Sequence, residues 1–345
     1  MLDKIRVSNF RNFTDQVFNF SSQTTVIVGA NATGKTNILE AINLLSTAKS
    51  FKAGKIDEMI NLDSEIARVK AKIGEDILEI ILTHGTITRG TVTEKTQRKK
   101  LLVNDTPKRM VDFASHFTTV VFRPQDIELI SGSPSVRRKF LDDLLSQVDR
   151  EYRRSLLTYE KGLKRRNKVL YQIREEGIPR NSLFFWDNLL IKNGDYIAKK
   201  RLQFVEYLSG KESPDGTDFR IEYDKSAISE ERIVQYANAE VASATTLVGP
   251  HRDDIIFYFG EKNLEKYGSR GQQRMGVLWA KLAELEFIKQ ETNQSPILLL
   301  DDIFSELDHE HRELIKNVVK DCQTIITSPD PHYIEALEAQ ETITL

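Results

Sequence analysis

The segment Val26-Ile27-Val28-Gly29-Ala30-Asn31-Ala32-Thr33-Gly34-Lys35-Thr36-Asn37 sets the architecture of this 345-residue chain. Its first three residues are β-branched and predict a buried strand that ends at Gly29. Residues 29–36 then match G-x-x-x-x-G-K-[ST], the phosphate-binding loop. Glycines let the backbone N–H groups of such a loop point at anionic oxygens, and the helix that follows adds partial positive charge. The segment therefore predicts a strand, a loop that binds a nucleoside triphosphate, and a helix.

Several residues of this loop have an expected role. Lys35 supplies a positive charge for the β- and γ-phosphates, and the hydroxyl of Thr36 can ligate Mg²⁺. Apolar residues then recur at helical spacing from Ile38 to Leu45. A glycine-rich turn that binds nothing is the alternative interpretation. The residues expected to contact the nucleotide are Gly29, Ala30, Asn31, Ala32, Thr33, Gly34, Lys35, Thr36 and Asn37.

A second apolar run is followed directly by two acidic residues. Residues 297–300 predict a buried strand that ends at Asp301 and Asp302. We expect Asp301 to hold magnesium and Asp302 to orient or polarise the attacking water. A strand followed by acids before a helix is the structural alternative. About 265 residues separate Thr36 from Asp301, so a large insertion lies between two halves of one site.

A further buried strand is predicted at Thr119–Phe122, followed by Arg123-Pro124-Gln125-Asp126. A polar side chain at the end of such a strand can contact a bound phosphate or its metal. Gln125 is therefore a candidate for both the metal site and catalysis.

The first residues alternate loosely and predict two strands of a hairpin within residues 2–20, around Asn9-Phe10-Arg11-Asn12-Phe13. Two interpretations of Arg11 stand: an ordinary surface charge, or a nucleotide-binding residue in a turn beside the phosphate loop.

Residues 66–104 predict antiparallel strands, at 66–73, 77–82 and 86–93, with a last short strand before a turn at Asn104-Asp105.

The middle of the chain predicts helices from Ser133-Pro134 onward, including 152–174 and 183–208. Residues 137–180 contain thirteen Lys or Arg against seven Asp or Glu, although the whole chain carries a formal charge of −2. A local basic surface of this kind is a nucleic-acid candidate. A solvated helical face is the alternative.

A second phosphate-seeking element is Gly268-Ser269-Arg270-Gly271-Gln272-Gln273, directly before another helical pattern. A Ser- and Gly-rich turn at a helix N-terminus favours anions. One nucleotide site cannot easily use two such elements. We therefore expect a dimer in which Ser269, Gly271 and Gln272 of each subunit close on the γ-phosphate held by the other.

The cluster Gly249-Pro250-His251-Arg252-Asp253-Asp254 combines a histidine with two carboxylates. We interpret it as a salt-bridged structural corner, because the chain has no His/Cys spacing typical of zinc sites. The single Cys322 excludes an internal disulfide and fits a small buried residue in a reducing compartment. Apolar runs are too short to span a bilayer, and the first residues lack the shape of a signal peptide. These features predict a cytoplasmic protein without a membrane partner.

The order of these motifs resembles that of an ABC-type ATPase head. Ser269, Gly271 and Gln272 resemble its signature, and Asp301 with Asp302 its Walker B pair. Within that group the chain closely resembles the RecF family of bacterial recombination mediators. The stretches that carry this resemblance are 9–13, 29–36, 132–134, 137–138, 140–142, 249–254, 269–273, 300–302 and, as a D-loop, Ser305-Glu306-Leu307-Asp308.

The resemblance implies an α/β fold with two lobes. An ABC-type P-loop ATPase lobe, a mixed sheet with helices, would comprise residues 1–125 and 249–345, with 66–104 as an antiparallel strand subdomain. An inserted, mainly helical lobe would comprise residues 126–248.

The resemblance also implies a function. The family forms ATP-dependent homodimers, uses ATP with Mg²⁺, hydrolyses it slowly when stimulated by DNA, and binds double-stranded DNA at gapped junctions. With RecR and RecO it directs RecA onto gaps during DNA repair, replication restart and the SOS response to DNA damage.

Three departures from the motif patterns qualify this resemblance. Gln125 stands where RecF proteins often carry an acid, Arg270 replaces a glycine of the transporter signature, and Ser328-Pro329 stands where transporters place a switch histidine. Asp302 is then the expected water-positioning group. The alternatives are a transporter-type ATPase subunit, an SMC-like structural DNA tether, and an ATP-timed DNA clamp in which hydrolysis only resets binding.

Overall fold

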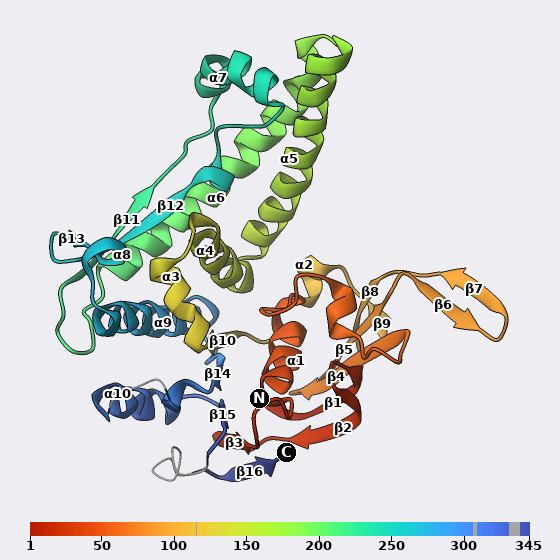
Figure 1. The fold of residues 1–345 in the computed structure, drawn as a ribbon, viewed down its shortest axis with the longest axis vertical. Coiled ribbons are helices and arrows are strands. Elements are labelled where there is room, and N and C mark those ends of the chain that lie inside the picture. The colour runs from red at the N-terminus through yellow and green to blue at the C-terminus, as the bar shows by residue number, and fades with distance from the viewer. Residues whose placement is uncertain (115, 306–308, 331–338) are drawn as a thin grey trace. The chain divides into compact units, whose positions relative to one another are not determined.

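The computed structural model describes residues 1–114, 116–305, 309–330 and 339–345. The chain divides into two compact units, which Figure 1 shows as ribbons. Unit 1 contains Met1–Asp126 and Glu284–Leu345, and unit 2 contains Ile127–Ala283. The sequence-based division, at 126 and 249, differs from this in residues 249–283. These residues belong to unit 2 because β12 (Asp254–Phe259) pairs along its whole length with β11 (Phe219–Asp224).

A parallel sheet forms one core of unit 1. Its order among the described residues is β10-β14-β15-β3-β16. The strands are β10 (Thr119–Phe122), β14 (Ile297–Asp301), β15 (Thr324–Ser328), β3 (Thr24–Val28) and β16 (Glu341–Thr344). Every residue of β14 and β15 is buried, as expected for strands covered on both faces. The register pairs Asp301 with Thr327 and Val28 with Ser328, so the carboxyl ends of three neighbouring strands meet at one edge.

An antiparallel sheet forms the second layer of unit 1, in the order β2-β1-β4-β5-β8-β9. Its strands are β1 (Leu2–Phe10), β2 (Phe13–Asn19), β4 (Ile66–Ile73), β5 (Asp76–Thr83), β8 (Lys99–Val103) and β9 (Thr106–Pro107). Ile5, Val69 and Ile80 of this sheet share one hydrophobic core with Ile38 and Ile42 of α1 (Lys35–Thr47). The predicted N-terminal hairpin is confirmed, as are the strands expected at 66–73, at 77–82 and before the turn at Asn104-Asp105.

One expected strand is wrong. The sequence predicts a single strand over 86–93, whereas the chain forms a hairpin of β6 (Thr86–Arg89) and β7 (Val92–Lys95). The turn between them contains Gly90, with φ +63°. Glycine adopts this left-handed conformation without steric cost, so it ends one strand and reverses the chain.

Unit 2 combines helices with a small antiparallel sheet of β11, β12 and β13 (Lys262–Asn263). Its longest helices, α5 (Arg150–Glu176) and α6 (Phe184–Ser209), confirm the helices predicted over 152–174 and 183–208, and they form a hairpin (Figure 1). They approach closely at Gly162, where a Cβ would lie 2.5 Å from Leu189. The helices of unit 2 are α3 (Glu128–Ser131), α4 (Pro134–Val148), α5 (Arg150–Glu176), α6 (Phe184–Ser209), α7 (Glu230–Ser243), α8 (Leu264–Tyr267) and α9 (Arg270–Thr292). Helix α9 continues beyond Ala283, where unit 2 ends. Besides α1, unit 1 contains the helices α2 (Met110–Phe113) and α10 (His309–Val319).

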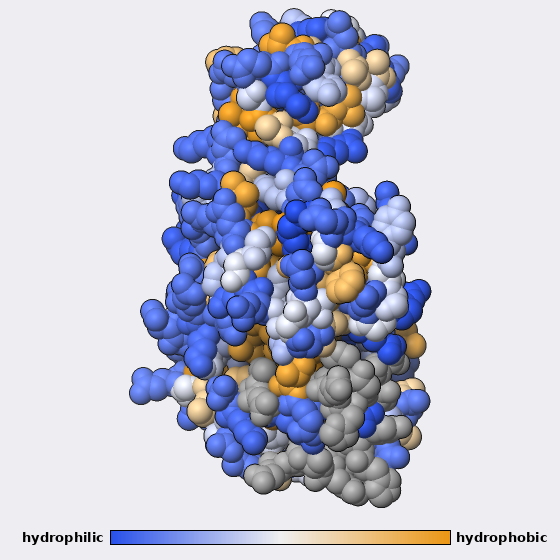
Figure 2. All heavy atoms as spheres, turned by 90° about the vertical axis from the view of Figure 1, so that its left-hand side faces the viewer, coloured by the Kyte–Doolittle hydropathy of each residue, from blue (hydrophilic) through white to orange (hydrophobic). Residues whose placement is uncertain are grey.

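The surface is mainly hydrophilic on the face drawn in Figure 2, with smaller hydrophobic groups between the polar side chains. Within the described part of the chain, no helix is both long enough and apolar enough to cross a membrane. Cys322 is buried, as predicted.

Gln323 ties β1 to the start of β15 in unit 1. Its amide nitrogen donates to the carbonyl oxygens of Leu2 (2.7 Å) and Ser21 (2.8 Å). Its amide oxygen accepts from the backbone N–H of Leu2 at 2.9 Å. One buried side chain therefore satisfies three backbone groups, which would otherwise lose their hydrogen bonds on burial.

We expect Gln323→Leu to lower the free energy of unfolding by about 2 kcal/mol, because it leaves buried backbone groups without partners. Urea unfolding monitored by circular dichroism measures the change. Gln340→Leu is the matched control: Gln340 is exposed, and within the described part of the chain its side-chain amide bonds only to the side chain of Gln23. Equal losses in the two variants would contradict the proposed role of Gln323.

Candidate functional site

The phosphate loop connects β3 to α1, as predicted. Gly34 has φ +111°, and a Cβ there would lie 2.6 Å from the ring of Phe13 and 2.8 Å from the amide of Asn12. Only glycine satisfies both the conformation and the space. Asn12 also donates to the carbonyl of Thr33 (2.9 Å) and accepts from the amide of Asn37 (2.8 Å). The turn between β1 and β2 therefore supports the loop from one side.

Lys35 places its charge inside the loop. Its side chain is buried, and Nζ donates to the carbonyl oxygens of Gly29 (2.5 Å) and Ala30 (2.8 Å). Two carbonyl dipoles thus take over part of the solvation that the ammonium loses on burial. This holds the cation within the loop where phosphate oxygens are expected to bind.

The two halves of the predicted site come together in unit 1. Thr36 Oγ1 donates to Asp301 Oδ1 at 2.8 Å, across 265 residues of sequence. Thr327 Oγ1 donates to the same oxygen at 2.9 Å. Asp301 is buried at the carboxyl end of β14, where the parallel register places it beside Thr327.

This pair fits a magnesium ion that arrives with a triphosphate. A hydroxyl and a carboxylate offer hard oxygen atoms, and Mg²⁺ usually takes one or two protein ligands and completes its shell with waters and phosphate oxygens. Among the described residues, no group of three or more His, Cys, Asp or Glu could hold a metal by itself.

Asp302 follows β14 in the left-handed region, with φ +50°. Its backbone N–H donates to Thr327, to Oγ1 at 3.0 Å and to the carbonyl oxygen at 3.2 Å. These bonds hold a conformation that costs most non-glycine residues about 1 kcal/mol or more and that Asp and Asn tolerate best. The backbone of Asp302 is therefore fixed relative to β15.

Gln125 lies one strand away at the same sheet edge. It is exposed within the short turn Pro124–Ile127, which follows β10, and β10 pairs directly with β14. Its expected contact with a phosphate or metal stays a prediction. In the predicted D-loop, Glu306, Leu307 and Asp308 lie outside the described residues.

Arg11 has another partner in this structure. Its guanidinium makes two hydrogen bonds to the carboxylate of Glu40, at 2.6 and 2.8 Å, and one to the carbonyl of Glu58 at 2.5 Å. Glu40 is fully buried in α1, so its charge requires such a pair. These contacts give Arg11 a positioning role toward α1, and the expected nucleotide contact stays a prediction. Glu40 was missed, although a charge between the apolar residues of α1 is the signal that identifies it.

The serine turn forms a capping box at the start of α9 in unit 2. Gln272 donates its backbone N–H to Ser269 Oγ (3.3 Å), and Ser269 donates its own N–H to Gln272 Oε1 (2.9 Å). Ser269 and Gly271 are exposed, and among the described residues, apart from the chain neighbours and backbone of α9 itself, the atom nearest to a Cβ on Gly271 would be Ser269 Oγ at 4.0 Å. The turn is therefore preformed, and its backbone is open to a ligand.

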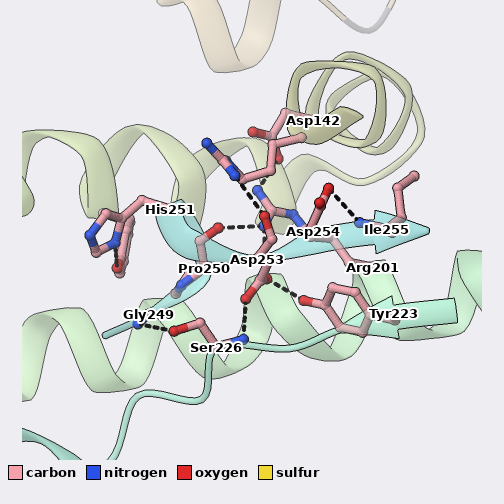
Figure 3. A network of polar contacts seen from close by, with 12 residues as sticks. Asp142, Arg201, Tyr223, Ser226, Gly249, Pro250, His251, Asp253, Asp254 and Ile255 are labelled. Carbon is pink, nitrogen blue, oxygen red and sulfur yellow. Dashed lines mark hydrogen bonds and ion pairs between the residues drawn. The ribbon is translucent and has the colours of Figure 1, made fainter. Parts of the chain in front are cut away.

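The cluster 249–254 is a salt-bridged corner in unit 2, as predicted (Figure 3). Asp253 is fully buried and accepts from Arg201 Nη1 (2.9 Å), from the backbone N–H of Ser226 (2.8 Å) and from the hydroxyl of Tyr223. Burial, and then the adjacent Asp253 charge, raise the pKa of Tyr223. These contacts tie the residue before β12 to α6, to β11 and to the segment that follows β11, and none resembles a catalytic constellation.

His251 is neutral within this corner. Its Nε2 lies 3.0 Å from the carbonyl of Thr246, which can only accept, and its Nδ1 lies 2.8 Å from the hydroxyl of Tyr159. The ring therefore carries its proton on Nε2 and accepts from Tyr159 at Nδ1. Burial lowers the pKa of His251 to about 4.

Acid should destabilise the protein through His251. Its pKa in the unfolded chain is about 6.5, so its contribution is complete above that pH and is lost as the pH falls toward about 4. Between pH 6.5 and 5 we expect a loss of about 2 kcal/mol in the free energy of unfolding. Urea unfolding at pH 7, 6 and 5 should show this fall in the wild type and a shallower one in His251→Gln. Replacement of the exposed His84 by Gln should leave the fall intact. A wild-type pH dependence in His251→Gln would refute the assignment.

The sequence of this chain is similar to those of known proteins. The family model described as RecF/RecN/SMC N terminal domain matches residues 1–345. The DNA replication and repair protein RecF of Lachnoclostridium phytofermentans is 36% identical, over 95% of this chain and 92% of its own length.

The fold of this chain is also similar to those of solved RecF structures. The recombination mediator protein RecF-ATPrS in the RecFOR pathway superimposes with a TM-score of 0.88 at 32% identity, covering 100% of this chain and 96% of that chain. RecF-ATP in the same pathway gives 0.86 at 33%, covering 95% and 92%. An Smc head domain from Pyrococcus furiosus, at a TM-score of 0.52 and 17% identity over 99% of this chain and 92% of that chain, shares the fold alone.

Proposed function

Since the chain belongs to the RecF/RecN/SMC N-terminal domain family, and within it to the RecF DNA replication and repair proteins, we propose that it is an ATP-dependent, DNA-binding recombination mediator. One observation carries the proposal: the hydrogen bond of 2.8 Å between Thr36 and Asp301 joins the two halves of a nucleotide site. The open serine turn at Ser269 then supplies a second phosphate-binding element for a partner subunit.

In this proposal the chain binds ATP through the N–H groups of residues 29–36. Lys35 exchanges its two loop carbonyls for oxygens of the β- and γ-phosphates. Thr36, Asp301 and Gln125 are the residues that would hold Mg²⁺, which neutralises charge on the phosphates when bound. Asp302 orients the water that attacks the γ-phosphorus.

Completion of the site requires a second copy of the chain. Ser269 Oγ, with the backbone of Gly271 and Gln272, would close on the γ-phosphate held by the other subunit. Hydrolysis would then release the dimer. The end of β15 supports slow turnover, because Ser328 stands there and donates to the carbonyl of Asp330 at 2.7 Å, so Asp302 acts without help from a histidine at this position.

The ATP-bound homodimer would clamp double-stranded DNA near single-strand gaps and, with RecR and RecO, promote RecA loading. Hydrolysis would be weak, stimulated by DNA, and serve as a switch for binding. The RecF proteins of known structure that this chain resembles are described in the RecFOR pathway, which supports this role.

Light scattering with and without ATP and Mg²⁺ tests the composite site. The wild type should double in mass with ATP, whereas Ser269→Arg should stay monomeric because the longer side chain fills the space for the partner's γ-phosphate. Ser243→Arg, an exposed substitution near the end of α7, should dimerise like the wild type. If the wild type binds ATP yet forms no dimer with or without DNA, the proposed mechanism fails.

Asp302→Asn should prolong the residence of the protein on duplex DNA. Asparagine adopts positive φ as readily as aspartate, so the loop after β14 keeps its shape while hydrolysis slows. Loss of a catalytic base typically slows proton transfer by about 10²- to 10⁴-fold, so we expect a DNA lifetime at least about tenfold longer. Surface plasmon resonance with ATP measures it. Lys35→Arg, which impairs ATP binding, should instead shorten the lifetime; a shorter lifetime for Asp302→Asn would contradict the switch.

A further inference from the structure

One face of α5 carries an unusual run of cations, here called the basic stripe: Lys161, Lys164, Arg165 and Lys168. Their spacing of three, four and seven residues places all four on one side of a helix. Each of the four is exposed.

The opposite side of α5 explains where the stripe points. Tyr159, Gly162, Arg166 and Leu170 are buried along that side. Gly162 lies against Leu189 and Leu190 of α6. The basic stripe is therefore directed away from the interior of unit 2.

The stripe lacks acidic partners, in contrast to other cations of this helix. Arg154 pairs with Glu151 (2.9 Å), and Arg166 pairs with Glu240 (2.7 Å). Over the described residues, no ion pair or hydrogen bond joins any of the four stripe side chains to another side chain. Like charges three and four residues apart destabilise a helix, so this arrangement gives the isolated subunit no benefit.

The shape of the basic stripe indicates which kind of anionic partner it could bind. Lys161 and Lys168 are seven residues apart, or about 10 Å along the helix axis. Such an extended, convex row cannot converge on one small anion. A membrane-surface helix presents an apolar face beside its cations, whereas the apolar face of α5 is buried. A polymer with regularly spaced charges fits best.

We propose that the basic stripe binds the phosphate backbone of double-stranded DNA. About 10 Å corresponds to roughly three phosphates of one strand at 3.4 Å of axial rise each, which matches four flexible cations. The proposal rests on the proposed function and deepens it, because it assigns one DNA-contacting surface to unit 2.

The test compares two full-length variants of equal net charge. The stripe variant carries Lys161→Gln, Lys164→Gln, Arg165→Gln and Lys168→Gln. The control replaces four scattered, exposed lysines by Gln: Lys4, Lys72, Lys225 and Lys262. Fluorescence anisotropy measures binding to a 30-base-pair duplex with ATP and Mg²⁺ from 50 to 300 mM KCl.

The stripe variant should bind more weakly, and its slope of log K against log[KCl] should be less negative by about 3 to 4 for each subunit that contacts DNA, because each phosphate contact contributes about 0.9. The control should follow the wild type. A variant with Lys161→Arg, Lys164→Arg and Lys168→Arg retains the charge and should keep the wild-type slope. Light scattering and thermal unfolding of the stripe variant should show wild-type dimerisation and undiminished stability.

Three outcomes would overturn the proposal. A wild-type slope in the stripe variant would refute the stripe while the ATP-dependent DNA-binding function stands. A loss confined to single-stranded DNA of the same length would refute the assignment to duplex. Failure of the wild type itself to bind duplex DNA with ATP would refute both the stripe and the proposed function.

Discussion

The hydrogen bond from Thr36 to Asp301 is the contact on which the candidate nucleotide site depends. It joins the first turn of α1 to the end of β14, at 2.8 Å and across 265 residues. The bond forms because the parallel sheet aligns the carboxyl ends of β3, β15 and β14 at one edge. Thr327 Oγ1 then holds both acids at this edge, since it donates to the carboxylate of Asp301 at the end of β14 and accepts from the backbone N–H of Asp302, the next residue. Unit 2 is inserted in the sequence between β10 and β14, which still pair with each other, so the insertion leaves this edge of the sheet intact.

Much of this could be predicted from the sequence, because the deciding signals are local. The strand-loop-helix at 26–37 and the acids after 297–300 are short patterns with one dominant structural solution. Long-range partners leave weaker signals. Glu40 reads as an ordinary helical residue until Arg11 is seen beside it, and the pairing of β12 with β11 moves residues 249–283 into unit 2. These contacts depend on tertiary packing, which propensity and periodicity do not encode.

In unit 2, several buried charged side chains are held in ion pairs, whereas some exposed cations are not paired with any described residue. Arg166 and Glu240 are both almost fully buried and pair at 2.7 Å, and Arg201 likewise pairs with the buried Asp253. A buried charge without its partner is strongly destabilising, so these pairs constrain how the helices and β12 assemble. The basic composition of residues 137–180 therefore has two causes, and composition alone cannot separate them.

The presence or absence of an ion-pair partner distinguishes the two causes of this basic composition. Arg165 and Arg166 are adjacent in sequence, yet Arg166 is bound to Glu240 and Asp187 within the fold, whereas Arg165 faces solvent. The first is accounted for by the stability of unit 2. The second belongs to an exposed row of like charges, whose mutual repulsion a bound anionic partner would reduce. A basic helix can thus be divided, residue by residue, into cations that hold the protein together and cations that are available to a partner.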